Sequence, residues 1–369
     1  MQLIAETNIK LNNRQLKRIV TDAEKSAEAV NLMYVSDQSP GIIRIRSGDK
    51  FEYYYQDKKV FDDEELLRIK HLTIPPAWEN VWICPRPNGH LQATGWDSLK
   101  RKQYKYHILW TRLRDHTKYY RLHEFGKILP LIRSQLEKDI SLPGLPLEKV
   151  LATVVSLMER TSIRIGSNFY EKLYGSFGLT TLKDKHVKIN GTHIRFSFIG
   201  KKGIPHDIEI KSKKLAGIVK KCRDIPGREL FQYYDENGER KTIDSGIVNA
   251  YIKNISGGDF TAKDFRTWAG TVQAFLAFKE LGCSETDTET KRKINEALDI
   301  VSHHLGNTRS VCKKYYVHPT IISLYESRNI EKYIKQMDDT RMNGEKTLLT
   351  AEEEVVMNIL DSKGATERL

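Results

Sequence analysis

The spacing of the apolar residues changes near residue 110 of this 369-residue chain. Before that point, short runs such as residues 42–46 and 51–55 are rich in β-branched and aromatic residues, which is typical of strands. After it, apolar residues recur every three or four positions, as in Val150, Val154 and Met158, which is typical of helices. We therefore predict an α+β protein. A small N-terminal β-sheet domain with helices precedes a larger, mainly α-helical domain that carries a small antiparallel β-sheet.

The predicted N-terminal domain covers residues 1–110. Its expected elements are a helix over 1–38, a hairpin over 42–46 and 51–55, a capped helix over 62–69, and a strand pair over 81–84 and 91–94. Ser39, Pro40 and Gly41 are breakers that should end the first helix.

The predicted second domain covers residues 111–369. Asn190-Gly191 is a hairpin turn signal inside residues 186–199, and residues 204–210 fit a third strand of the same sheet. Thr261 and Asp264 have the spacing of a capping box, so we expect a long helix from there to Gly282. A further helix should end at Gly306, and a final acidic helix is expected over residues 351–360.

Composition restricts the class of partner. Lys+Arg exceed Asp+Glu by 12 and the sequence pI is about 9.3, which favours a polyanion such as nucleic acid. The four cysteines form no CxxC pair, and His303 and His304 are adjacent on a helix and face different ways, so we predict neither a metal site nor disulfides. No apolar run approaches the roughly 20 residues of a membrane span, and the N-terminus is not a signal peptide, so we expect a cytoplasmic protein.

Two basic segments are candidate DNA contacts. The first alternates cations with aromatic residues, which suits phosphates and bases, although taken alone its default interpretation is a solvated, basic surface strand or helix start. The second is a dense lysine patch whose default interpretation is a solvated helix face. The candidates are Arg101, Lys102, Gln103, Tyr104 and Tyr106 in the first segment, and Lys211, Lys213, Lys214, Lys220 and Lys221 in the second.

Residues 307–316 combine Asn307, a basic run and the neighbouring phenols of Tyr315 and Tyr316. A phenol has a reference pKa of about 10 and needs nearby positive charge to act as a nucleophile at pH 7. The cations that could supply this charge lie far upstream. Arg164 stands where a helix gives way to a loop at Gly166, Lys201 stands between glycines in a hairpin turn, and Arg266 stands in the first turn of a helix. An exposed turn lysine and a structural arginine remain alternatives for the last two.

Taken in order, these signals resemble the type IB DNA topoisomerases, specifically their poxvirus-like bacterial branch. The resemblance runs from about residue 35 to 330, and its segments are jointly specific. They are residues 74–78, 88–95, 101–104, 163–168, 198–201, 263–268 and 305–316. Two departures stand out: the family often has histidine where Asn307 lies, and residues 95–100 lack the usual glycine pattern.

The resemblance implies that Tyr316, nine residues after Asn307, attacks a DNA phosphodiester and leaves a 3′-phosphotyrosyl bond with a free 5′-hydroxyl. In that case, Arg164 and Arg266 stabilise the charged transition state, Lys201 protonates the departing 5′-oxygen, and Asn307 donates a further hydrogen bond. Rotation of the free 5′ end then relaxes supercoils of both signs before religation. The expected partner is duplex DNA of the bacterial nucleoid, which the two domains clamp. The expected enzyme is a monomer that requires neither ATP nor a divalent metal.

One geometric problem follows from this assignment. In a continuous helix, Asn307 and Tyr316 would lie about 13 Å apart on opposite faces, out of reach of one phosphate. We therefore expect the tyrosine segment to be bent or mobile without DNA.

Two other classes share parts of the pattern. A tyrosine recombinase has the same Arg, Lys, Arg, Tyr order but usually has His-x-x-Arg at the second arginine, where this chain has Lys263 three residues before Arg266. A DNA-binding protein without activity would need a decayed catalytic set, and the set here is complete. Plasmid relaxation in chelator without ATP distinguishes the three classes.

Overall fold

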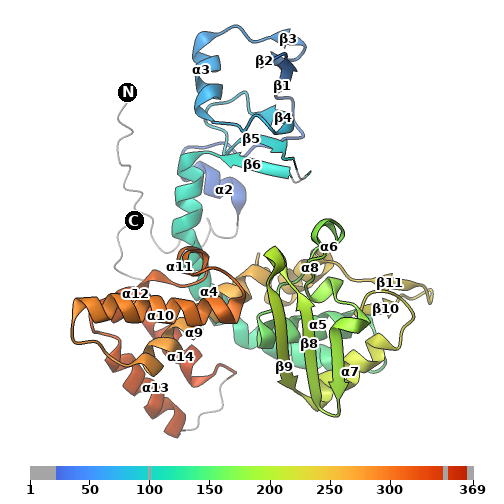
Figure 1. Cartoon of the computed structure of the whole chain (residues 1–369), viewed down its shortest axis with the longest axis vertical. Helices are drawn as coiled ribbons and strands as arrows, with labels where there is room; N and C mark the ends of the chain where they lie inside the picture. Colours follow the sequence, from blue (N-terminus) through green and yellow to red (C-terminus); the bar gives the residue numbers. More distant parts are fainter. Residues whose placement is uncertain (1–21, 99, 101, 344–347, 364–369) are drawn as a thin grey trace. The chain divides into compact units, whose positions relative to one another are not determined.

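The computed structural model describes residues 22–98, 100, 102–343 and 348–363. The chain divides into two compact units at Arg121, inside the long helix α4 (Ile108–Ile140). Each unit has its own buried apolar clusters. The α+β class is confirmed: an N-terminal antiparallel sheet is followed by a larger, mainly helical unit with a small sheet (Figure 1).

The N-terminal unit is built on a six-stranded antiparallel sheet with strand order β3-β2-β1-β4-β5-β6. Its strands are β1 (Ile42–Ser47), β2 (Lys50–Tyr55), β3 (Lys58–Lys59), β4 (Glu79–Ile83), β5 (Leu91–Trp96) and β6 (Lys102–Tyr106). Both predicted strand pairs are found. The predicted capped helix is α3 (Asp63–His71), where the Asp62 carboxylate accepts a hydrogen bond from the amide of Glu65.

The predicted helix over residues 1–38 is wrong beyond residue 28, and residues 1–21 lie outside the described part of the chain. The helix α2 covers only Ala23–Glu28. Asn31 has a φ of 57°, a left-handed conformation that does not continue a helix. Val30 and Leu32 are buried with Trp110, so tertiary packing determines the path of this segment.

The second unit contains one three-stranded antiparallel sheet, one two-stranded sheet and several packed helices. The strands are β7 (Val187–Asn190), β8 (His193–Ile199), β9 (Pro205–Lys211), β10 (Gln232–Tyr234) and β11 (Arg240–Thr242). The α-helices that follow α4 are α5 (Leu147–Thr161), α6 (Asn168–Tyr174), α7 (Lys213–Arg223), α8 (Ser245–Ser256), α9 (Ala262–Leu281), α10 (Asp287–Leu305), α11 (Arg309–Tyr315), α12 (Pro319–Glu326), α13 (Glu331–Asn343) and α14 (Ala351–Lys363). The single-turn 3₁₀ helices η1 (Leu179–Thr181), η2 (Asp184–His186) and η3 (Lys201–Gly203) lie between these elements.

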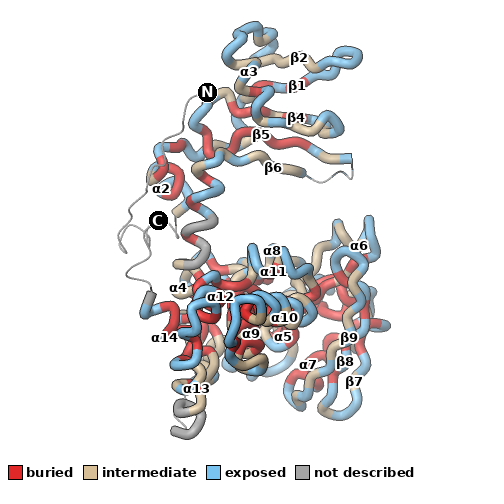
Figure 2. The backbone as a smooth tube through the Cα atoms, turned by 60° about the vertical axis from the view of Figure 1, so that its left-hand side comes forward, coloured by how far each residue is buried: buried red, intermediate tan, exposed pale blue. Residues whose placement is uncertain are grey.

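The helix α5 lies at the centre of this unit, and most of its residues are buried (Figure 2). It packs against α7, α8 and α9 and also against β9 and β10. This helix ends at Thr161, and Ser162 follows in a left-handed conformation. Ile163 is still buried, and the chain then leaves the core at a fixed point to form the partly exposed segment 164–168.

The helix α9 begins as the sequence predicts, with the Thr261 and Asp264 capping box, and Gly282 caps its end. Its inward face buries Phe265, Trp268 and Phe275. A capped, buried helix is a rigid support, and this one carries Arg266 as its fifth residue, just after the first turn in which the sequence predicts it.

The C-terminal helix α14 packs against α9. Glu353 of α14 accepts hydrogen bonds from Trp268 of α9, at 2.9 Å, and from Arg133 of α4, at 2.7 and 2.8 Å. Arg133 also donates to Glu159 of α5 at 2.7 Å. The final acidic helix is thus packed into the core of the second unit rather than being a loose tail.

Candidate active site

Arg164 lies in the loop that follows α5, at the point predicted from the sequence. Backbone bonds from Leu179 and Thr180 to the carbonyls of Arg164 and Ile165, at 2.9 and 2.7 Å, hold this loop in place. A Cβ on Gly178 would stand 2.5 Å from the Arg164 carbonyl oxygen, so the close backbone approach requires glycine there. The loop therefore presents the arginine from a fixed backbone.

Arg266 is buried, with 5% of its surface exposed. Its guanidinium donates to the carbonyl of Ser162, and to that of Leu305 at 2.7 Å, and so joins the end of α5 to the end of α10. Within the described residues its Nε has no hydrogen-bond partner. Burial lowers the pKa of Arg266, while the nearby Tyr316 phenol acts in the opposite direction.

The two arginines form one positive centre. Burial, together with the positive charge of Arg266, lowers the pKa of Arg164 to about 10, so the Arg164 guanidinium remains charged at neutral pH. Among the described residues, neither arginine forms an ion pair with a carboxylate. Two desolvated cations without a counter-charge are costly, and an anionic ligand would relieve that cost.

Asn307 lies beside Arg164. The Nη2 of Arg164 donates to the Asn307 side-chain oxygen at 2.5 Å and to the Gly306 carbonyl at 3.0 Å. Gly306 caps α10 in a left-handed conformation, with φ of 57°, which turns the chain toward this contact. With its oxygen occupied, the amide of Asn307 has its NH₂ group as the donor to offer an anion.

Tyr316 is held against α9. Gly270, one turn after Arg266, lies under its backbone, and the Thr271 hydroxyl donates to the Tyr316 carbonyl at 3.3 Å. The ring centroid of Tyr316 stands 5.3 Å from the guanidinium carbon of Arg266. Since positions i and i+4 share a helix face, α9 sets the arginine and the tyrosine side by side.

The segment between Asn307 and Tyr316 is bent, which confirms the prediction. Asn307 lies outside both helices, because α10 ends at Leu305 and α11 begins at Arg309 with Thr308 as its N-cap. Tyr316 ends α11 with a φ of −126°. The tyrosine nevertheless already lies beside Arg266 in the absence of DNA. The bend alone therefore brings Tyr316 to the arginine, without a separate movement of the segment.

Lys201 lies apart from this cluster, in the turn η3 at the tip of the β8–β9 hairpin. Its side chain is exposed, and its ammonium stands 5.1 Å from the ring centroid of Tyr170 on α6. The expectation of a desolvated lysine between two cations is therefore wrong for the protein without DNA. Four of the five predicted residues, Arg164, Arg266, Asn307 and Tyr316, converge, and the fifth stands on the adjoining turn.

Comparison with known proteins agrees with this geometry. Residues 100–343 match the family described as eukaryotic DNA topoisomerase I, catalytic core, and residues 50–97 match that described as bacterial DNA topoisomerase IB, N-terminal domain. DNA topoisomerase 1B of Acanthamoeba polyphaga mimivirus is 33% identical over 307 residues, which cover 81% of this chain and 91% of the viral protein. The chain belongs to the type IB DNA topoisomerases.

Two other viral proteins match at lower identity and over somewhat less of the chain. DNA topoisomerase 1B of vaccinia virus (strain Copenhagen) is 24% identical over 296 residues, 75% of this chain and 90% of its own. DNA topoisomerase 1 of rabbit fibroma virus is 23% identical over 293 residues, 73% of this chain and 88% of its own. These matches favour a type IB topoisomerase over a tyrosine recombinase.

The predicted DNA contacts of the N-terminal unit lie on β6, the last strand of the sheet, while Arg101 lies outside the described residues. Tyr104 and Tyr106 are exposed and stacked, with ring centroids 6.0 Å apart. Lys102 pairs with Asp37 at 2.5 Å, and Gln103 donates to Asp97 at 2.9 Å. In this type IB topoisomerase the tyrosines are the available surface, whereas the other two side chains already have partners.

The lysines of the second basic segment gather at the far end of β9 from Lys201. All are exposed; they are Lys211 on β9 and Lys213, Lys214, Lys220 and Lys221 on α7. Six strand steps of about 3.3 Å put roughly 20 Å between the turn of Lys201 and the start of α7. Lys214 also bonds Glu137 at 3.0 Å. The patch is thus separate from the arginine centre.

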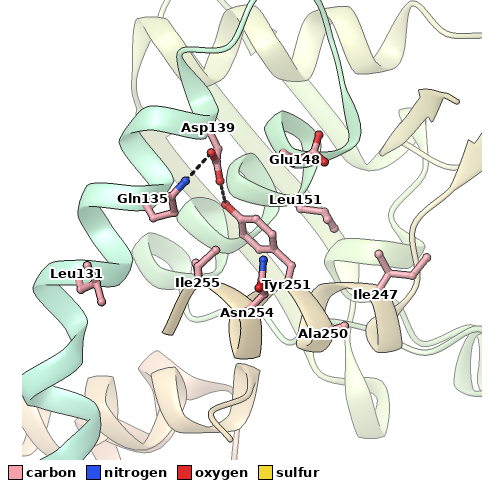
Figure 3. A pocket seen from close by; sticks show the side chains of 10 residues that line it. All are labelled: Leu131, Gln135, Asp139, Glu148, Leu151, Ile247, Ala250, Tyr251, Asn254 and Ile255. Carbon is pink, nitrogen blue, oxygen red and sulfur yellow. Dashed lines mark hydrogen bonds between the residues drawn. The ribbon is translucent and has the colours of Figure 1, made fainter. Parts of the chain in front are cut away.

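A surface hollow of about 610 Å³ lies between α4, α5 and α8, away from the five residues (Figure 3). Its polar centre is Asp139, which accepts hydrogen bonds from Tyr251 at 2.6 Å and from Gln135 at 2.8 Å. Burial, then the hydrogen bond to Asp139, raises the pKa of Tyr251. This phenol is kept neutral at physiological pH, so the hollow is not a second nucleophilic site.

Sequence reasoning missed three residues that shape the site: Gly270, Thr271 and His206. No motif marks them, although the spacing of four between Arg266 and Gly270 on one helix face was available as a signal. His206, on β9, packs against both Gly200 and Gly306.

Two further observations concern metal ions and membranes. Within residues 22–343 and 348–363, apart from 99 and 101, no three His, Cys, Asp or Glu side chains are grouped as metal ligands, and no helix there is long and apolar enough to cross a membrane.

Proposed function

We propose that this enzyme relaxes supercoiled duplex DNA through a transient covalent bond between Tyr316 and a 3′-phosphate. The observation that carries the proposal is the pair of desolvated guanidinium groups, Arg164 and Arg266, without a carboxylate partner among the described residues and beside the phenol of Tyr316. A phosphodiester would supply the missing negative charge.

In the cleavage step, the phenolic oxygen of Tyr316 attacks phosphorus and its proton passes to solvent. The bond from phosphorus to the 5′-oxygen breaks, and Lys201 gives a proton to that oxygen to form the 5′-hydroxyl. Arg164, Arg266 and the amide of Asn307 bind the non-bridging oxygens as charge gathers on them. One phosphodiester replaces another, so religation is the exact reverse and consumes no high-energy cofactor.

Lys201 must come closer to the phosphate than its position over Tyr170. Because it lies on a hairpin turn and carries a long side chain, a rearrangement of the side chain when DNA binds can bring it there. The negative charge of the bound phosphate then attracts the Lys201 ammonium. The proposal therefore assigns Lys201 a role that only the complex completes.

We further propose that the enzyme requires neither ATP nor a divalent metal, acts as a monomer, and works on chromosomal DNA in the cytoplasm. Two arginines, a lysine and an amide from one chain provide the positive charge and the donors that a metal would otherwise supply. Catalysis then needs no second subunit.

The test is relaxation of a supercoiled plasmid in excess chelator without ATP, at limiting enzyme. The proposal expects both supercoil signs to be relaxed and expects Tyr316→Phe to bind DNA without nicking it. Phe retains the ring beside Arg266, so the variant removes only the nucleophilic oxygen. Relaxation that needs a metal or ATP would contradict the cofactor proposal, and nicking by Tyr316→Phe would contradict the role of Tyr316.

A further inference from the structure

His206 occupies a tight space between two glycines of the second unit. A Cβ on Gly200 would stand 2.6 Å from the imidazole Cδ2, and a Cβ on Gly306 would stand 2.6 Å from its Cε1. The ring also stacks on Phe198, with centroids 5.0 Å apart and planes inclined by 16°. Both glycines therefore admit this ring only because they lack a side chain.

Each glycine immediately precedes a residue of the proposed mechanism. Gly200 opens the turn that carries Lys201, and hydrogen bonds from Gly200 to Ile204 and from Gly203 to Gly200, at 2.7 and 3.2 Å, close that turn. Gly306 precedes Asn307, and its carbonyl accepts the bond from Arg164. The imidazole thus bridges the turn of the lysine and the centre that contains the arginines.

The charge of this imidazole is settled by its surroundings. Burial, then the positive charges of Arg164 and Arg266, lowers the pKa of His206 to about 4. At neutral pH the ring is uncharged, so it neither repels the arginines nor competes with them for a phosphate. It is not a proton donor for the 5′-oxygen under these conditions, which leaves a role through shape and contact.

We propose that His206 is a positioning residue that sets the distance between the turn of Lys201 and the arginine centre, so that the ammonium can reach the departing 5′-oxygen. The inference rests on the proposed role of Lys201 as general acid. The β8–β9 hairpin tip is held by its own turn bonds, and the imidazole fixes that tip against the cap of α10. Without the ring, the tip loses its contact with Gly306.

The experiment measures single-turnover cleavage of two DNA substrates that differ at one bridging atom. In the first the 5′-oxygen leaves, and in the second a 5′-sulfur replaces it. A thiolate is a far weaker base than an alkoxide and leaves without a proton. A variant in which only the general acid is misplaced should therefore cleave the oxygen substrate slowly and the sulfur substrate at close to the wild-type rate. A variant with a damaged arginine centre or a damaged fold should cleave both substrates slowly.

For His206→Ala we expect cleavage of the oxygen substrate to slow by about 10- to 100-fold, part of the effect of a general acid, and cleavage of the sulfur substrate to stay within about threefold of wild type. Equal slowing on both substrates would overturn the proposal, as would wild-type rates on both. The control is His193→Ala. His193 begins β8, at the opposite end of the strand from Gly200, and its exposed imidazole contacts Glu209. This control should match wild type on both substrates.

If His206→Ala fails to fold, Gly200→Ala tests the same contact by adding a methyl group that pushes against the His206 ring. Its φ lies outside the left-handed region, so the added methyl is opposed by the imidazole rather than by backbone strain. We expect Gly200→Ala to slow the oxygen substrate and spare the sulfur substrate, and the addition of His206→Ala to relieve part of its defect. Strict additivity of the two changes would contradict the contact. Failure of the mechanism itself is separate: Lys201→Ala would then not be repaired by sulfur.

Discussion

The carbonyl oxygen of Tyr316 lies so close to Gly270 that a Cβ at position 270 would stand 2.7 Å from it. The same Cβ would stand 3.1 Å from the Cβ of Tyr316. Gly270 therefore fixes how closely the tyrosine approaches α9, and with it the distance from its ring to Arg266. The nucleophile is positioned by the absence of a side chain.

Gly270→Ala should push Tyr316 away from Arg266. Displacement of a reacting group by about 1 Å can cost about 100-fold in rate, so we expect a loss of that order in single-turnover cleavage with little change in DNA affinity. The matched control is Gly217→Ala on α7, where a Cβ meets nothing within 4 Å. It should leave cleavage unchanged and stabilise its helix by up to about 1 kcal/mol. Wild-type cleavage by Gly270→Ala would show that this contact does not position the tyrosine.

Arg266→Lys should lower the cleavage rate by about 100- to 1,000-fold even though the positive charge is kept. The guanidinium bonds Ser162 and Leu305 through two separate nitrogens and has further N–H groups for a phosphate, whereas the three donors of a lysine all sit on one nitrogen and cannot reproduce this spread. The rate is measured in single turnover at saturating enzyme, so that weaker binding does not enter. Arg195→Lys on β8 is the control, because Arg195 is exposed and paired with Asp207. A loss of less than tenfold at position 266 would mean that charge alone suffices there.

Acid should destabilise the fold partly through His206. Its pKa is about 4 in the folded protein and about 6.5 when unfolded, so between these values the unfolded chain binds the extra proton. The contribution of the neutral imidazole is complete above pH 6.5 and is lost as pH falls toward 4. Thermal unfolding across this range should therefore show a shallower fall for His206→Ala than for wild type. Parallel curves for the two proteins would contradict the environment assigned to His206.

Removal of the lysines at the far end of β9 should weaken binding without altering chemistry. Each lysine that neutralises a phosphate contributes about 0.9 to the slope of log affinity against log salt. For Lys211→Gln with Lys213→Gln, we expect a slope reduced by up to about 1.8, with single-turnover cleavage of bound DNA unchanged. Lys253→Gln on α8, where the lysine pairs with Asp259, is the control. An unchanged slope would show that this patch does not face DNA phosphates.

Much of the framework follows from local sequence patterns. The hairpin around Asn190-Gly191 and the capping box at Thr261 were predictable because short-range backbone chemistry determines them. The first helix was overestimated because apolar residues at helical spacing, Val30 among them, are recruited by a partner distant in sequence, Trp110. The spacing of apolar residues predicts which residues are buried, but it does not predict which other part of the chain they pack against.

The site shows the same limit. Arg164 and Tyr316 were found through their motifs, but the residues that position them are glycines and a histidine whose role exists only in three dimensions. Gly270 matters because Tyr316 returns to α9 from 46 positions further along the chain. Lys201 was expected between cations, whereas the hairpin places it over Tyr170. Its environment without DNA depends on which helix stands beside the turn, and no local pattern encodes that.

The most direct measurement is the identity of the residue that becomes linked to DNA. A nicked duplex that traps the covalent intermediate is incubated with the enzyme, digested with protease and nuclease, and the modified peptide is sequenced by mass spectrometry. We expect a single nucleotide adduct, attached through its 3′-phosphate to Tyr316, and no adduct with Tyr316→Phe. An adduct on Tyr315, a 5′-phosphate linkage, or trapping that persists in Tyr316→Phe would contradict it.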